Sequence, residues 1–174
     1  MNTKNLVLSS LFAAITAITS QITIPIQPVP ITFQVLAVAL AGALLGKKYG
    51  FISQIVFLLL GAIGIPVFAE FKGGLNIIAG PTGGYLLAYP LAAYITGYFS
   101  EKEGIVNISI GMILGLIIIY ILGMLQLKFI LNLSLQKAFM VGVAPFLILD
   151  LIKLIIASFI VNTILKRSNV FQKA

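Results

Sequence analysis

The sequence predicts an all-α integral membrane protein, with six transmembrane helices in a single domain that covers residues 1–174. Three observations lead to this prediction. Of all residues, 60% are hydrophobic and only 9% are charged, whereas about a quarter of the residues of a soluble domain are charged. Six apolar runs are separated by short connections, and the lysines and arginines lie mostly at the ends of these runs. A chain with this pattern buries its apolar surface in lipid.

The six runs approach the length of about 20 mostly apolar residues that a spanning helix needs. The first run begins near Lys4, lacks a clear cleavage site and is followed by further spans, so we expect a retained helix rather than a signal peptide. The second and third runs are short, so one of them is expected to be tilted, kinked or only partly spanning. In order, the runs are Leu6–Ile24, Thr32–Gly46, Gly50–Pro66, Thr82–Phe99, Ile105–Leu125 and Val141–Leu165.

The distribution of basic residues predicts that both termini face the cytoplasm. Cytoplasmic segments of membrane proteins are enriched in Lys and Arg. With the N-terminus inside, the cytoplasmic segments contain Lys4, Lys47, Lys48, Lys102, Lys166, Arg167 and Lys173, whereas the outer ones contain only Lys72, Lys128 and Lys137. The connections Pro25–Ile31, Val67–Pro81 and Gln126–Met140 then face outwards.

Composition excludes several classes of function. The chain has no cysteine and no histidine, which removes disulfides, thiol chemistry and the common zinc sites. The net charge of +7 comes from scattered residues rather than a basic patch, which argues against nucleic-acid binding. Neither Gly42–Lys48 nor Gly80–Gly84 has the spacing and ending of a phosphate-binding P-loop. The four acidic residues include Glu101 and Glu103 on the expected cytoplasmic side, so no catalytic group can be assembled and we do not expect an enzyme.

Asp150 and Lys153 lie inside the sixth apolar run. A charged group within the hydrocarbon costs at least about 2.5 kcal/mol, so both must face the protein interior or a water-filled cavity. Their spacing places them on one helical face, where they can pair or hold a polar ligand together. The alternative is an ion pair that only fixes helix packing. We favour a ligand site, because a buried pair by itself contributes little stability.

The stretch Phe68–Leu86 gathers charge, glycine, proline and aromatic rings between apolar runs, and we interpret it as part of a ligand site. Its first half, Phe68–Asn76, is expected to form a movable lid. Its core, G-P-T-G-G-Y-L at Gly80–Leu86, comes directly before the fourth run. The alternative for this core is a tight turn that merely starts a helix.

Within that core, Thr82 is expected to cap the helix, whose first N–H groups attract ligand oxygens. Gly83 and Gly84 would let a ligand approach the backbone closely. Tyr85 and Tyr89 lie four residues apart and present two rings on one helical face.

The connection before the second run contains three prolines, Pro25, Pro28 and Pro30, and is expected to be a stiff, extended strap. Phe33 and Gln34 follow it into the membrane. The Gln34 amide can bind a ligand or make a contact between helices, and the sequence leaves both open.

Small residues recur at helical spacing on the first run, at Ser9, Ala13 and Ala17. Such a stripe lets another helix approach closely. The partner helix can belong to this chain or to another subunit.

Together these stretches resemble the BioY family, the biotin-specific substrate-binding S components of energy-coupling factor (ECF) transporters. The resemblance covers most of Ile24–Lys153. It rests on P-V-P-I-T-F-Q at Pro28–Gln34, L-A-G-A-L-L-G at Leu40–Gly46, L-L-L-G-A-I-G-I-P-V-F at Leu58–Phe68, G-P-T-G-G-Y-L at Gly80–Leu86 and P-F-L-I-L-D-L-I-K at Pro145–Lys153. The connection Gln126–Met140 and the C-terminal tail match no motif.

The resemblance implies a six-helix S component in the plasma membrane of a bacterium or archaeon, with biotin held near the outer face. It implies a transmembrane coupling subunit and two ATPase subunits as partners, which alone use ATP, so that biotin is the transported ligand and no cofactor is expected. The stripe Ser9, Ala13 and Ala17 resembles the first-helix alanine motif by which such S components dock on the coupling subunit.

For biotin, Asp150 would accept from the urea N–H groups, and Lys153 would meet either the carbonyl or the carboxylate. Asn76 is a further candidate for the urea edge. Four aromatic residues suit the ring and aliphatic chain of biotin, namely Phe33, Phe68, Tyr85 and Tyr89. The alternative functions are a stand-alone ion-coupled carrier for a small carboxylate or vitamin, and a membrane-embedded enzyme.

Overall fold

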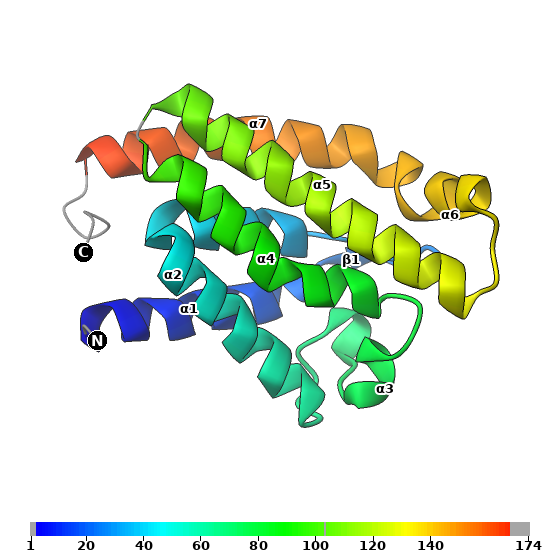
Figure 1. Cartoon of the computed structure of the whole chain (residues 1–174). Helices are drawn as coiled ribbons and strands as arrows, with labels where there is room; N and C mark the ends of the chain where they lie inside the picture. The colour runs from blue at the N-terminus through cyan, green and yellow to red at the C-terminus, as the bar shows by residue number, and fades with distance from the viewer. Residues whose placement is uncertain (1–2, 103, 168–174) are drawn as a thin grey trace.

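The computed structural model describes residues 3–102 and 104–167, and Glu103 and Lys173 lie outside the described residues. The described chain is mostly helical (Figure 1). Its elements are α1 (Thr3–Ser20), β1 (Thr23–Ile24), β2 (Ile31–Thr32), α2 (Gln34–Ala62), the short 3-10 helix η1 (Ala69–Phe71), α3 (Leu75–Ile78), α4 (Gly83–Ser100), α5 (Ile105–Ile130), α6 (Leu135–Gly142) and α7 (Ala144–Arg167). The predicted all-α fold is confirmed.

Helix α2 is broken at Gly46, which has a φ of 76°. This left-handed conformation favours glycine, and it divides α2 into two arms that match the second and third predicted runs. The arms, together with α1, α4, α5 and α7, give six long helical segments among the described residues. By length and composition, three helices can cross a membrane, namely Gln34–Ala62, Ile105–Ile130 and Ala144–Arg167. The protein is an integral membrane protein.

Helix α4 packs against α2 and α5, while α1 packs against α2. Glycines allow the close contacts: a Cβ on Gly42 of α2 would overlap the carbonyl oxygen of Ala93 on α4. Small residues at helix contacts are the usual means of tight packing in membranes. Gly42 therefore brings α2 and α4 into close contact, beside a core of buried hydrophobic residues.

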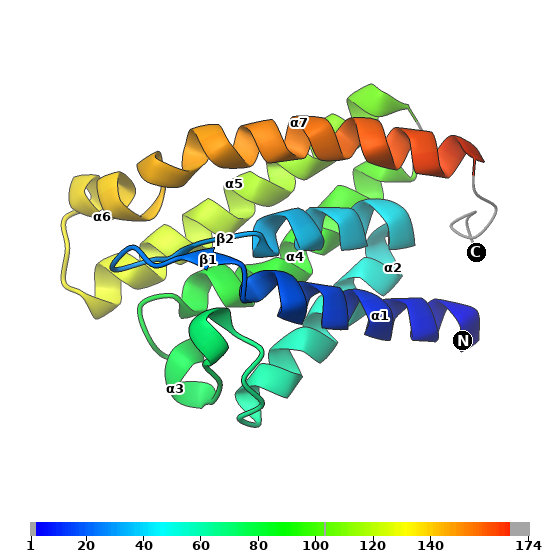
Figure 2. The same cartoon turned by 180° about the vertical axis from the view of Figure 1, so that it is seen from behind.

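The two ends of the bundle differ in structure. The start of α1, the Gly46 bend, the α4–α5 turn and the end of α7 lie at one end, while the β1–β2 hairpin, α3 and α6 lie at the other (Figure 2). The start of α1 and the end of α7 thus lie on the same side, as the predicted topology requires. The hairpin end holds the site described below.

Two connections are more ordered than the sequence suggested. The proline-containing strap is closed by antiparallel pairing of Thr23 with Thr32 and of Ile24 with Ile31. The predicted connection Gln126–Met140 needs correction, because α5 continues to Ile130 and α6 begins at Leu135. Ser134 starts α6 by accepting a hydrogen bond from the Lys137 N–H at 3.2 Å, which is a typical N-cap contact.

Candidate ligand-binding site

A cavity of about 460 Å³ lies at the hairpin end of the bundle. This volume is within the range of about 300–1,000 Å³ that small-molecule sites occupy. Its lining comes from the strap, the start of α2, the loop between α2 and α4, and helices α4, α5 and α7. The buried residues of this lining that carry polar groups form its floor and are Gln34, Tyr85, Tyr89, Tyr120 and Asp150. The exposed charged and amide residues form its rim and are Gln27, Glu70, Lys72 and Asn76.

Asp150 is 4% exposed and is held from two sides. Its Oδ1 accepts a hydrogen bond from Lys153 Nζ at 3.0 Å, and its Oδ2 accepts one from the Tyr120 hydroxyl at 2.8 Å. The predicted Asp150–Lys153 pair is therefore present. Each carboxylate oxygen retains a second lone pair that a ligand donor can use.

Lys153 is not among the residues that line the cavity. Its Nζ also donates to the carbonyl oxygen of Thr32 at 3.1 Å and lies 4.7 Å from the centroid of the Phe33 ring. Phe33, likewise predicted as a ligand contact, is outside the lining and covers this cation. Lys153 thus neutralises and positions Asp150, and Phe33 packs on Lys153, rather than either residue facing the cavity.

Gln34, at the start of α2, carries an unpaired amide group on the cavity floor. Its Oε1 accepts hydrogen bonds from the Tyr89 hydroxyl at 3.1 Å and from Thr32 Oγ1 at 3.3 Å. Its Nε2 is buried and has no hydrogen-bond partner within the described part of the chain. Leaving a buried donor unpaired costs about 1–3 kcal/mol. A ligand acceptor placed here would remove that cost.

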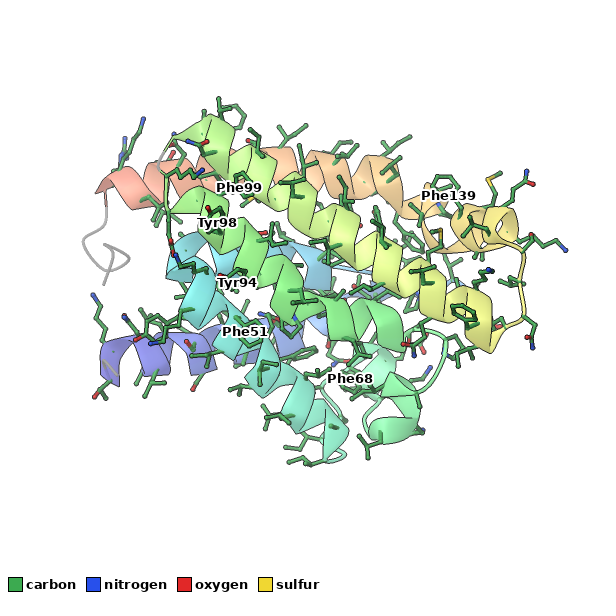
Figure 3. All side chains as sticks on the ribbon, in the orientation of Figure 1. Phe51, Phe68, Tyr94, Tyr98, Phe99 and Phe139 are labelled. Carbon is green, nitrogen blue, oxygen red and sulfur yellow. The ribbon has the colours of Figure 1, made fainter. Side chains whose placement is uncertain are left out.

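Aromatic rings form one wall of the cavity. Phe68 is 1% exposed, and its ring centroid lies 5.6 Å from that of Phe57 in an edge-to-face arrangement. The Tyr89 ring also lies near Phe57, at 6.3 Å between centroids. Figure 3 shows Phe68 between the end of α2 and the start of α4. Tyr85 also lines the cavity, and its hydroxyl donates to the Gly142 carbonyl at 2.8 Å.

The loop that carries Phe68 is fastened to the end of α1 by two side chains that the sequence analysis did not single out. Ser20 Oγ donates to the Val67 carbonyl at 2.5 Å. Gln21 donates from Nε2 to the Phe68 carbonyl at 3.1 Å and accepts the Phe71 N–H on Oε1 at 2.9 Å. These bonds fix the loop in place over the cavity.

The glycine-rich turn before α4 needs two corrections. Gly83 and Gly84 do not line the cavity, and a Cβ on Gly84 would overlap the Leu122 carbonyl oxygen of α5. Their small size serves helix packing. Thr82 occupies the N-cap position and lines the cavity, but its side chain makes no capping hydrogen bond. Instead, Gln126 Nε2 satisfies the turn by donating to the carbonyl oxygens of Ile78 and Gly80, each at 2.8 Å.

The structure therefore brings together most of the predicted ligand contacts. Those that line the cavity are Gln34, Phe68, Asn76, Thr82, Tyr85, Tyr89 and Asp150, whereas Phe33, Gly83, Gly84 and Lys153 do not. The sequence analysis missed Tyr120, Glu70 and Lys72 as lining residues. The signal for Tyr120 was its position as the one tyrosine in the run Ile105–Leu125.

The small-residue stripe on α1 is not an open surface. Ser9 and Ala13 are each 1% exposed, and Ser9 Oγ donates to the Tyr49 carbonyl of α2 at 3.2 Å. These two residues pack closely against α2, which is the alternative of packing within this chain, so they are not free to contact another subunit. Ala17 is partly buried beside them. The exposed small residues in the middle of α1 are Ser10 and Ala14.

Comparisons with known proteins agree with this geometry. A protein of Pyrococcus horikoshii named probable biotin transporter BioY is 44% identical over 154 residues, which are 88% of this chain and 91% of that protein. The biotin transporter BioY of Thermotoga maritima is 43% identical over 158 residues, or 90% of this chain and 93% of that protein. A crystal structure of the S component for biotin from an ECF-type ABC transporter matches with a TM-score of 0.88 and 32% identity, over 97% of this chain and 96% of that chain. The model of the BioY family matches residues 1–169, and the chain therefore belongs to the BioY family.

Proposed function

We propose that this chain is the high-affinity biotin-binding subunit, or S component, of an ECF-type ABC transporter. It captures biotin at the extracellular face and passes it on together with a transmembrane coupling subunit and two ATPase subunits. Membership of the BioY family, the names of the relatives and the match to a biotin S component support this proposal. The subunit itself performs no covalent chemistry and needs no cofactor, because ATP is used only by its partners.

The observation that carries the proposal is the pair of hydrogen-bonding groups on the cavity floor. Biotin has a cyclic urea with two N–H donors and one carbonyl acceptor. Asp150 offers acceptor lone pairs, and the unpaired Gln34 Nε2 offers a donor. The aromatic wall of Phe68 and Tyr89 suits the apolar ring and chain.

The test is calorimetric titration of biotin into the purified full-length protein in detergent. We expect Asp150→Asn to weaken binding by at least about 100-fold, because a carboxylate that accepts from ligand donors is replaced by an amide that also donates. Gln34→Leu should weaken binding because the Nε2 donor to the ligand carbonyl is lost, without leaving Lys153 unneutralised. Lys137→Gln is the matched control, because Lys137 is exposed and outside the cavity lining. Failure of the unaltered protein to bind biotin would overturn the proposal, and unaltered binding in both floor variants would overturn the site assignment.

We further propose a location in the plasma membrane of a bacterium or archaeon, with both termini cytoplasmic. The excess of basic residues in the segments that this orientation places inside supports it. The cavity then opens towards the outside, where a captured vitamin would enter. Docking on the coupling subunit through α1 stays a prediction, and it would use the exposed face of Ser10 and Ala14.

A further inference from the structure

We propose that Lys72 binds the carboxylate of the ligand at the cavity rim and gives up its ion pair with Glu70 to do so. The inference rests on the proposed function and adds the direction in which biotin lies: the urea points to the floor and the acid to the rim. Nothing in the motifs of the chain singles out Lys72 for this role.

The charges of the cavity lining favour Lys72 as the partner of the ligand carboxylate. Among the described residues that line the cavity, Lys72 is the one cation, and Asp150 and Glu70 are the two acids. A ligand that carries a carboxylate therefore meets a positive charge at one place in the cavity. That place is the rim.

The floor of the cavity is unsuited to an anion. Asp150 is buried there, and like charges repel strongly where water is excluded. Lys153 balances the charge of Asp150 but offers a ligand anion no free cation, because it lies outside the cavity lining and its Nζ already bonds Asp150 Oδ1 at 3.0 Å and the Thr32 carbonyl at 3.1 Å. The floor therefore suits the neutral end of the ligand.

The backbone of Lys72 is held in a fixed position at the rim. Its carbonyl oxygen accepts a hydrogen bond from the Phe68 N–H at 2.9 Å, and the Phe68 ring is buried. Gln21 holds the same turn through the Phe68 carbonyl and the Phe71 N–H. The backbone of Lys72 is thus anchored, while its side chain is 55% exposed and can reach a ligand. A cation placed in advance binds with less loss of conformational entropy.

The ion pair that Lys72 forms with Glu70 is weak enough for a ligand to displace. Lys72 Nζ forms an ion pair with Glu70, whose side chain is 36% exposed. Ion pairs at such exposure stabilise by less than about fivefold in an equilibrium constant. A ligand carboxylate that is held in place by the buried urea end can therefore displace Glu70.

The experiment compares biotin with its neutral amide, biotinamide, by calorimetry on the purified full-length protein in detergent at low salt. We expect the unaltered protein to bind biotin more tightly than biotinamide. Lys72→Gln should weaken biotin binding by about fivefold to tenfold and leave biotinamide binding unchanged. Glu70→Gln should tighten biotin binding by up to about fivefold, because the competing carboxylate is gone. Lys137→Gln, a loss of one positive charge outside the cavity lining, should change neither.

Failure of this inference differs from failure of the proposed function. Equal weakening of biotin and biotinamide by Lys72→Gln, or no weakening of either, would overturn the assignment of Lys72 while biotin binding stands. Absence of binding of both compounds to the unaltered protein would overturn the proposed function and this inference with it. If the difference between the affinities for biotin and biotinamide shrinks when salt is raised, an ion pair between Lys72 and the ligand carboxylate is supported, since exposed charges are screened. A difference that does not respond to salt would contradict it.

Discussion

Groups on two helices hold the Asp150 carboxylate inside the bundle. Lys153 lies on the same helix three residues on, and Tyr120 reaches it from α5. The two partners leave the outer lone pairs of the carboxylate free for ligand donors. The Tyr120 hydroxyl bond is the one that orients the carboxylate relative to the cavity.

Replacing Tyr120 by Phe should weaken biotin binding by about tenfold, because a hydrogen bond to a charged group at 2.8 Å is lost while the ring remains. Calorimetry measures the affinity, and a melting curve in detergent separates this effect from unfolding. Tyr94→Phe on the exposed face of α4 is the matched control. Equal affinities of the Tyr120 and Tyr94 variants would show that Tyr120 does not position Asp150.

Residues of the site differed in how far the sequence revealed them. Asp150 and Lys153 could be predicted, because a charge in an apolar run must have a partner or a polar surrounding. Tyr120 could not, because a tyrosine in such a run also suits the membrane interface. The pairing of Lys153 with Asp150 was predicted correctly, but Lys153 does not line the cavity. Only the fold shows the Thr32 carbonyl that holds its Nζ.

Helix α1 is joined at its end to the loop that closes the cavity. Ser20 and Gln21 make three hydrogen bonds to the backbone of residues 67–71. A change in the tilt of α1 would therefore pull directly on Phe68 and on the rim. This link connects a helix on the outside of the bundle with access to the ligand site.

Gln21→Leu should loosen this loop and speed the release of biotin by about fivefold, because two of the bonds that hold the loop are removed. Stopped-flow displacement measures the release rate, and hydrogen exchange at the Phe71 amide reports the loosening directly. Gln136→Leu on exposed α6 provides the control. Faster exchange at Phe71 without faster release would show that the loop does not limit departure of the ligand.

The elements themselves were predictable to different extents. Apolar runs identified the six long helical segments, of which three helices are long and apolar enough to cross a membrane. Helix α6 was missed because its eight residues are amphipathic and too short for such a signal. Gly83 and Gly84 were assigned to the ligand because a glycine permits close approach by any partner, and only the fold shows that the partner is α5.

At the scale of the whole molecule, the cavity lies at one end of the bundle, and the start of α1 and the end of α7 lie at the other. The bend at Gly46 makes this possible, because it returns the chain so that the loop before α4 lies beside the hairpin. Two basic residues, Lys47 and Lys48, directly follow this bend in the chain. Lys47 Nζ forms an ion pair with Glu101 at 3.0 Å, which joins this part of α2 to the end of α4.

The proposed orientation predicts the accessibility of single cysteines, which can be introduced cleanly because the chain has none. Lys137→Cys on α6 should react with a membrane-impermeant maleimide in intact cells. Lys48→Cys, exposed beside the bend, should react only after the membrane is permeabilised. The reverse pattern would place the cavity on the cytoplasmic side.

The unpaired Gln34 Nε2 has a consequence for the timing of transport. A bound ligand whose acceptor pairs with this buried donor loses that hydrogen bond before water can replace it. The barrier to ligand release is therefore higher than the barrier to ligand entry. Differences in affinity arise mainly from such slow departure. Capture would then proceed without external energy, and the energy from the partner ATPases would be needed at the moment of release.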